Sequence, residues 1–145
     1  MNITALLLMI VLMLIIGYVG MTILIDKNIT NNLNKFYNAL FMAFIMILAK
    51  MVIFDDMYDP IIIGGLALGT IITYVLVKRQ SYINPVQYLL GMIEHHEMAV
   101  AMSSRLLKKK NVPAEVKELA TNIITLQNNE IELMRKYINK INKSV

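Results

Sequence analysis

The two histidines of this 145-residue chain are adjacent, and methionines surround them at helical spacing. Met92 precedes His95 and His96 by three and four residues, and Met98 precedes Met102 by four, so neighbouring turns of one helix would bring these side chains together. Imidazole suits copper, zinc, nickel and iron, and thioether sulfur narrows the choice towards Cu(I). The spacing therefore predicts a metal site with copper as its preferred ion.

A second group of polar residues is expected to face the first. Two amphipathic helices are predicted at about 84–110 and 113–141, each with one apolar stripe at intervals of three and four residues. His95 lies in the middle of the first stripe, and Gln127 and Glu130 interrupt the second. Folding both helices into an antiparallel hairpin about residues 111–112 brings these polar exceptions to one level. The candidate ligands are Met92, His95, His96, Met98, Met102, Glu130 and Met134, with Gln127 as a hydrogen-bonding group that fixes a histidine tautomer.

The same residues also have a purely structural interpretation. Methionine commonly fills helical cores, and this chain has 12 methionines. An inward histidine can simply bond Glu130 or Gln127 across the hairpin. The alternative function is accordingly a structural or assembly protein of a membrane, in which the histidine and methionine cluster serves only as packing.

Local signals mark the ends of both helices. Asn84 is a typical cap, Pro85 suits the first helical position, and lysines 108–110 lie in a last turn where the helix dipole favours cations. Pro113 opens the second helix. These signals predict a helical hairpin domain over residues 80–145.

The first half of the chain is apolar and predicts three transmembrane helices, at about 3–25, 36–54 and 60–77, in a membrane domain of residues 1–79. Gly65 and Gly69 form a small-xxx-small pattern in the third, which permits close helix contact. The overall fold class is therefore all-α, with the lipid bilayer as an expected partner.

Charge gives an expectation for orientation. The connection at 26–35 and the C-terminal domain place Lys27, Lys35, Lys78 and Arg79 near one membrane face, whereas the loop at 55–59 has no lysine or arginine. The positive-inside rule then places the C-terminal domain on the cytoplasmic side.

Composition excludes several functions. The absence of cysteine excludes disulfides, thiolate metal sites and a thiol nucleophile. The basic C-terminal half lacks the interleaved aromatic residues that stack on bases, so no nucleic acid is expected as a partner. No nucleophile or phosphate-binding loop accompanies the histidines, so we expect no enzyme activity.

Residues 87–103 (QYLLGMIEHHEMAVAMS) and 119–137 (LATNIITLQNNEIELMRKY) resemble the family called domain of unknown function 305. The resemblance implies a ferritin-like helical fold and, as in copper-associated members, metal binding by the histidine and methionine cluster. The apolar half resembles that of members with three N-terminal spans. One departure is Glu94, where the family commonly has proline before the first histidine. The matching residues are Met92, Ile93, His95, His96, Ala99, Met102, Ala120, Ile123, Ile124, Gln127, Glu130, Ile131 and Met134.

One hairpin buries its apolar stripes incompletely, and helix bundles commonly close with four helices. We therefore expect a homo-oligomer, a dimer whose two hairpins form a four-helix bundle.

Overall fold

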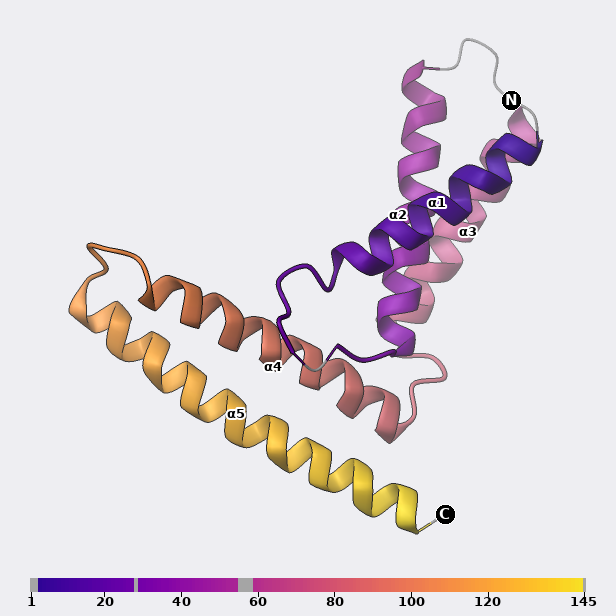
Figure 1. The fold of residues 1–145 in the computed structure, drawn as a ribbon. Helices are drawn as coiled ribbons and strands as arrows, with labels where there is room; N and C mark the ends of the chain where they lie inside the picture. The colour runs from indigo at the N-terminus through magenta and orange to yellow at the C-terminus, as the bar shows by residue number, and fades with distance from the viewer. Residues whose placement is uncertain (1–2, 28, 55–58, 145) are drawn as a thin grey trace. The chain divides into compact units, whose positions relative to one another are not determined.

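The computed structural model describes residues 3–27, 29–54 and 59–144. Its helices are α1 (Ile3–Gly20), α2 (Leu33–Phe54), α3 (Pro60–Lys78), α4 (Pro85–Leu107) and α5 (Ala114–Lys143), as Figure 1 shows. No strand occurs within the described residues. The predicted all-α class is confirmed. The predicted loop at 55–59 lies outside the described residues except for Asp59.

The chain divides into two compact units that are not the two halves of the sequence. The first unit holds α1, α2 and α3. The second holds α4 and α5 together with residues 22–32, the connection between α1 and α2. This connection was predicted to belong to the membrane domain. It instead forms hydrogen bonds with side-chain and backbone groups of α4 in the second unit.

In the first unit, α2 packs against both α1 and α3. A single line of residues four apart on α2, namely Ala39, Ala43, Ile47 and Met51, is at most 2% exposed. Side chains four apart share one helical face, so this line forms the centre of the unit. Leu6 from α1 and Leu66 from α3 complete the buried cluster around Ile47 and Met51.

Glycines let these helices approach one another at two places. A Cβ atom added to Gly17 would lie 3.4 Å from the Cα atom of Ala39, and one added to Gly69 would lie 2.9 Å from the ring of Phe44. No neighbour lies within 4 Å of such an atom at Gly65. Of the two glycines in the predicted packing pattern, only Gly69 therefore contacts another helix.

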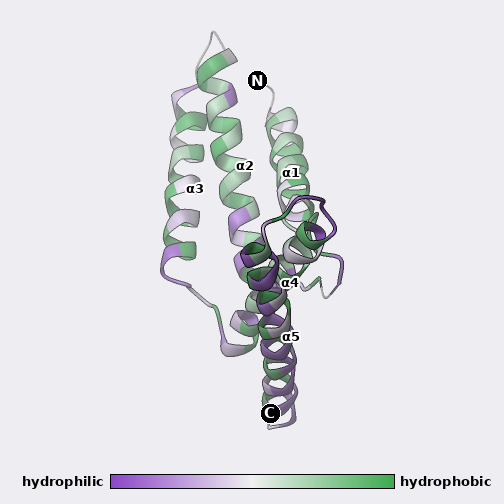
Figure 2. Cartoon of the chain, turned by 90° about the vertical axis from the view of Figure 1, so that its left-hand side faces the viewer, coloured by the Kyte–Doolittle hydropathy of each residue, from purple (hydrophilic) through white to green (hydrophobic). Residues whose placement is uncertain are grey.

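Two helices, α2 over residues 33–53 and α3, are long and apolar enough to cross a membrane. Figure 2 shows the predominantly hydrophobic colouring of all three N-terminal helices. The first predicted span, 3–25, is too long, because α1 ends at Gly20 and is a shorter apolar helix. The physical reason is that Ile25, assigned by hydropathy to the span, is instead buried in the second unit at 6% exposure.

In the second unit, α4 and α5 form a hairpin (Figure 1). The predicted Asn84 cap is confirmed: its side chain accepts a hydrogen bond from the backbone N–H of Gln87, and Pro85 follows at the first helical position. Between the helices Asn111 adopts a φ of 62°, a left-handed conformation that asparagine tolerates better than most residues. This residue lies in the turn that joins the two helices of the hairpin.

Candidate functional site

One histidine of the adjacent pair lies between the two helices of the hairpin. The Nδ1 atom of His96 is 3.1 Å from a carboxylate oxygen of Glu130 on α5. Despite this distance the pair lacks hydrogen-bond geometry, and among the described residues Nδ1 of His96 stands out as a buried side-chain atom with no hydrogen-bond partner. In the part of the chain that the structure describes, this nitrogen therefore has a close carboxylate contact but no hydrogen bond of good geometry.

Two methionines occupy the next helical turn towards the open end of the hairpin. Met92 precedes His96 by four residues on α4, and Met134 follows Glu130 by four on α5. Both pack in the apolar cluster that includes Ile93 and Ile131. The hairpin thus has a methionine on each helix, one turn away from the pair formed by His96 and Glu130.

The remaining predicted ligands lie elsewhere on α4. His95 is exposed, Met98 is half-buried, and Met102 is 54% exposed. Successive helical residues are rotated by about 100°, so when His96 faces α5 its neighbour His95 turns away. The prediction that placed His95 at the centre of the inward stripe is wrong by one residue. Gln127 is half-buried on α5, three residues before Glu130.

The donor set constrains the chemistry. Among the described residues, no three side chains of histidine, cysteine, aspartate or glutamate come together as metal ligands would. Within the described residues, His96 and Glu130 alone therefore do not make up a metal site of these four residue types. The two atoms are spaced as ligands of one ion would be, since ligands about 2.0–2.1 Å from a metal lie roughly 3 Å apart at common bond angles.

A different face of α4 binds the connection between α1 and α2. The buried carboxylate of Glu94 accepts hydrogen bonds from the backbone N–H of Thr30 at 2.6 Å and from Nδ2 of Asn32 at 3.0 Å. The Thr30 hydroxyl donates to the carbonyl of Leu90 at 3.0 Å. Residues 22–32, which we call the strap, are therefore held to α4 by buried polar contacts.

A second attachment lies near the other end of the strap. Arg105 donates through Nη1 to the carbonyl of Leu24 at 2.9 Å and through Nη2 to the carboxylate of Asp26 at 2.6 Å. The guanidinium is partly exposed, so this ion pair contributes less than the buried Glu94 contacts.

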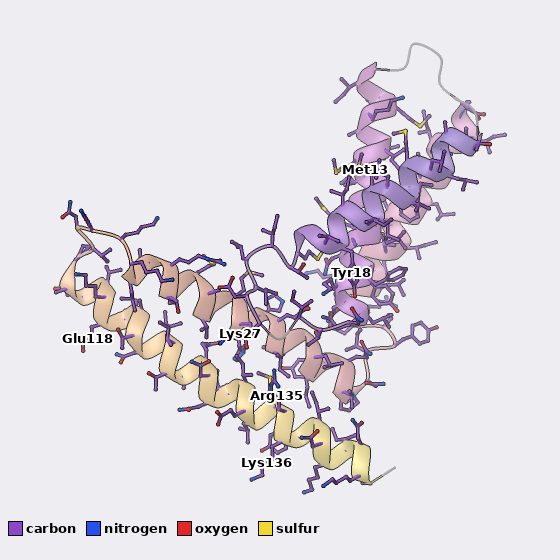
Figure 3. The ribbon with its side chains drawn as sticks, in the orientation of Figure 1. Met13, Tyr18, Lys27, Glu118, Arg135 and Lys136 are labelled. Carbon is purple, nitrogen blue, oxygen red and sulfur yellow. The ribbon has the colours of Figure 1, made fainter. Side chains whose placement is uncertain are left out.

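Glu97 is another buried carboxylic acid on α4. Burial raises the pKa of its carboxyl, while the charges of Arg135 and then Lys27 lower the pKa and that of Asp26 raises it. Figure 3 labels Lys27 and Arg135, which belong to the strap and to α5. Two buried carboxylic acids, Glu94 and Glu97, therefore flank the adjacent histidines in the sequence of α4.

Sequence reasoning missed the role of Glu94. A signal was present, because a glutamate directly precedes the two histidines in a helix that was expected to pack on both sides. An acidic side chain at that place can accept hydrogen bonds from backbone and amide donors, as it does here from the strap.

Comparison with known proteins identifies a family match in the C-terminal hairpin. Residues 85–145, which comprise α4, α5 and the turn between them, match the domain of unknown function DUF305. The C-terminal hairpin domain therefore belongs to this family of unknown function.

The similarity extends beyond the hairpin. The chain is 32% identical over 146 residues to the uncharacterised protein L153 of Acanthamoeba polyphaga mimivirus, covering 97% of this chain and 95% of that protein. The shared region therefore includes the three apolar helices and the strap. No solved structure matches the chain.

Proposed function

We propose that the protein is a membrane-anchored metal-binding protein that handles copper for storage, transfer or tolerance. The observation that carries the proposal is the Nδ1 atom of His96, a buried nitrogen without a hydrogen-bond partner that faces the carboxylate of Glu130. A buried polar atom without a partner costs free energy, and metal coordination would remove that cost.

The chemistry of the surrounding side chains favours copper over other ions. His96 and Glu130 supply nitrogen and oxygen, and Met92 and Met134 supply sulfur one turn away. Thioether ligands select Cu(I), whereas calcium and magnesium require more carboxylate oxygens than this region provides. Bound copper would be held by these four side chains, and the surrounding Ile93 and Ile131 would restrict access of water.

The apolar unit supports a membrane anchor. Large hydrophobic side chains on α1, α2 and α3 are widely exposed, including Leu8 at 65%, Ile53 at 68% and Ile61 at 85%. Exposed apolar surface of this extent requires a lipid or protein cover. We infer that all three helices cross the bilayer and, from the lysine and arginine bias, that the hairpin lies on the cytoplasmic side.

The adjacent histidines provide a matched test of the metal site. In purified full-length protein, His96→Ala should abolish stoichiometric Cu(I) binding, measured by competition with a chromophoric chelator and by elemental mass spectrometry. His95→Ala should retain it, because His95 is exposed. Equal copper contents of the wild-type protein and His96→Ala would contradict the proposal.

A second candidate is a structural or assembly protein. It is favoured by the packing of Met92 and Met134 against Ile93 and Ile131, which is ordinary for a helical core. This function predicts that the wild-type protein binds no copper and that replacing Met134 with leucine changes neither stability nor association.

A further inference from the structure

The helix α5 has a second apolar stripe that the hairpin leaves uncovered. The face towards α4 is formed by residues such as Ala120, Ile131 and Met134, all buried. Beside this face, large hydrophobic side chains are exposed along the length of the helix. They are Val116 (39%), Leu119 (59%), Leu126 (56%), Leu133 (47%) and Tyr137 (49%).

The spacing of this stripe is that of a coiled-coil seam. Leu119, Leu126 and Leu133 recur every seven residues. Each of these leucines lies three residues after one member of a second series and four residues before the next. The second series is Val116, Ile123, Glu130 and Tyr137. Alternating intervals of three and four define the a and d positions of a heptad repeat. A seam of this kind is narrow and fits another helix.

The polar residue within the seam argues against lipid as the cover. Glu130 occupies one of the a positions, between Leu126 and Leu133. A carboxylate in the apolar region of a bilayer is costly. At a helix interface, by contrast, Glu130 can stay beside His96 at the edge of the seam.

The charges along the seam favour a second copy in the antiparallel direction. The flanking g positions are Glu115 at one end, Asn122 and Asn129 in the middle, and Lys136 at the other end, all exposed. In an antiparallel pair g positions face each other, so Glu115 of each copy would lie opposite Lys136 of the other. A parallel pair would place the two Glu130 carboxylates together.

We propose that two copies of the chain associate through the α5 seam in antiparallel orientation. The two hairpins then supply the four helices with which helix bundles commonly close. The proposal is independent of metal binding, since the leucine seam and the terminal charges do not require an ion. It accounts for the apolar face of α5 that α4 leaves exposed.

Cross-linking tests both the partner and its direction, and the natural chain has no cysteine to interfere. Two single-cysteine proteins, Glu115→Cys and Lys136→Cys, are reconstituted together in metal-free detergent or lipid and treated with a short bifunctional thiol reagent. We expect a cross-linked dimer from the mixture and none from Glu115→Cys alone. A cross-link in Glu115→Cys alone, or none in either sample, would overturn the proposal.

The mass of the particle gives an independent measurement. Leu126→Glu should raise the dimer dissociation constant by about 100-fold or more, because each copy loses a buried leucine and gains a charge in the seam. Asn128→Glu adds the same charge at an exposed position outside the seam and should leave the dimer intact. Monomeric wild-type protein in light scattering would contradict the proposal, whatever the behaviour of the variants.

Discussion

The pKa of the Glu97 carboxyl responds to its burial and to charged residues of α5 and of the strap. Burial raises its pKa above the usual 4.5, although Arg135 and Lys27 act in the opposite direction. A raised pKa in the folded state means that the folded protein binds this proton more tightly than the unfolded protein does. The protonated Glu97 carboxyl therefore makes its full contribution to folding stability when the pH is below the usual pKa of about 4.5. That contribution is lost as the pH rises through the raised pKa of the folded protein.

We predict that Glu97→Gln flattens this pH dependence. Relative to the wild-type protein, the variant should gain stability on going from mildly acidic to neutral pH, because its side chain carries no charge to desolvate. Hydrogen exchange of the α4 amides measures the difference. Glu132→Gln, at an exposed position of α5, is the control and should follow the wild type. A parallel response of Glu97→Gln and the wild-type protein would contradict the assignment.

Residue types were more predictable than residue directions. The sequence correctly indicated which turn of α4 meets Glu130, because spacing and the position of the turn determine helix register. It assigned the inward direction to His95 instead of His96, since a rotation of about 100° separates adjacent residues and a stripe with several polar members does not resolve it. The copper site itself stays a prediction.

At the scale of helices, the packing of α3 against α2 depends on one glycine. We predict that Gly69→Leu destabilises the apolar unit by about 1–3 kcal/mol through overpacking, because even a Cβ atom there would lie 2.9 Å from the Phe44 ring. Unfolding in mixed detergent micelles measures the change.

The control is Gly65→Leu in the same helix. It gains the same helix propensity but meets no neighbour within 4 Å. If both variants lose equal stability, the loss comes from the leucine itself and not from contact with Phe44.

Helix existence could be predicted from composition and spacing, whereas helix ends were less predictable. Hydropathy extended the first helix to Ile25, because Ile23, Leu24 and Ile25 are as apolar as the span that precedes them. Only the tertiary burial of Ile25 in the second unit shows that the helix should end earlier. Hydropathy alone does not distinguish burial in protein from burial in lipid.

At the scale of the whole molecule, the strap makes each of the two units discontinuous in sequence. The backbone leaves the first unit after Met21, contributes residues 22–32 to the second, returns at Leu33, and enters the second again at Asn84. A boundary drawn from composition at residue 79 or 80 cannot detect this, because the strap is short and its partners lie about 60 residues away on α4.

We predict that Glu94→Ala releases the strap. The backbone N–H of Thr30 would lose its Glu94 acceptor, and Nδ2 of Asn32 would keep only its 3.3 Å bond to the Thr30 hydroxyl. Losing a buried hydrogen bond of this kind costs about 1–3 kcal/mol. Hydrogen exchange at Thr30 should accelerate by about tenfold or more.

Glu132→Ala serves as the control, because its side chain is exposed on α5. Unchanged protection of Thr30 in Glu94→Ala would show that other contacts hold the strap.

The strap also determines whether proteolysis between α3 and α4 would release the hairpin. A single cut near Gln80 and Tyr82, where both residues have positive φ, severs the only peptide link between α3 and α4. The released fragment would nevertheless remain bound to the rest of the chain, since the strap that it contacts is covalently joined to α1 and α2. Shedding of the hairpin as a free domain therefore requires two events, backbone cleavage and loss of the Glu94 and Arg105 contacts.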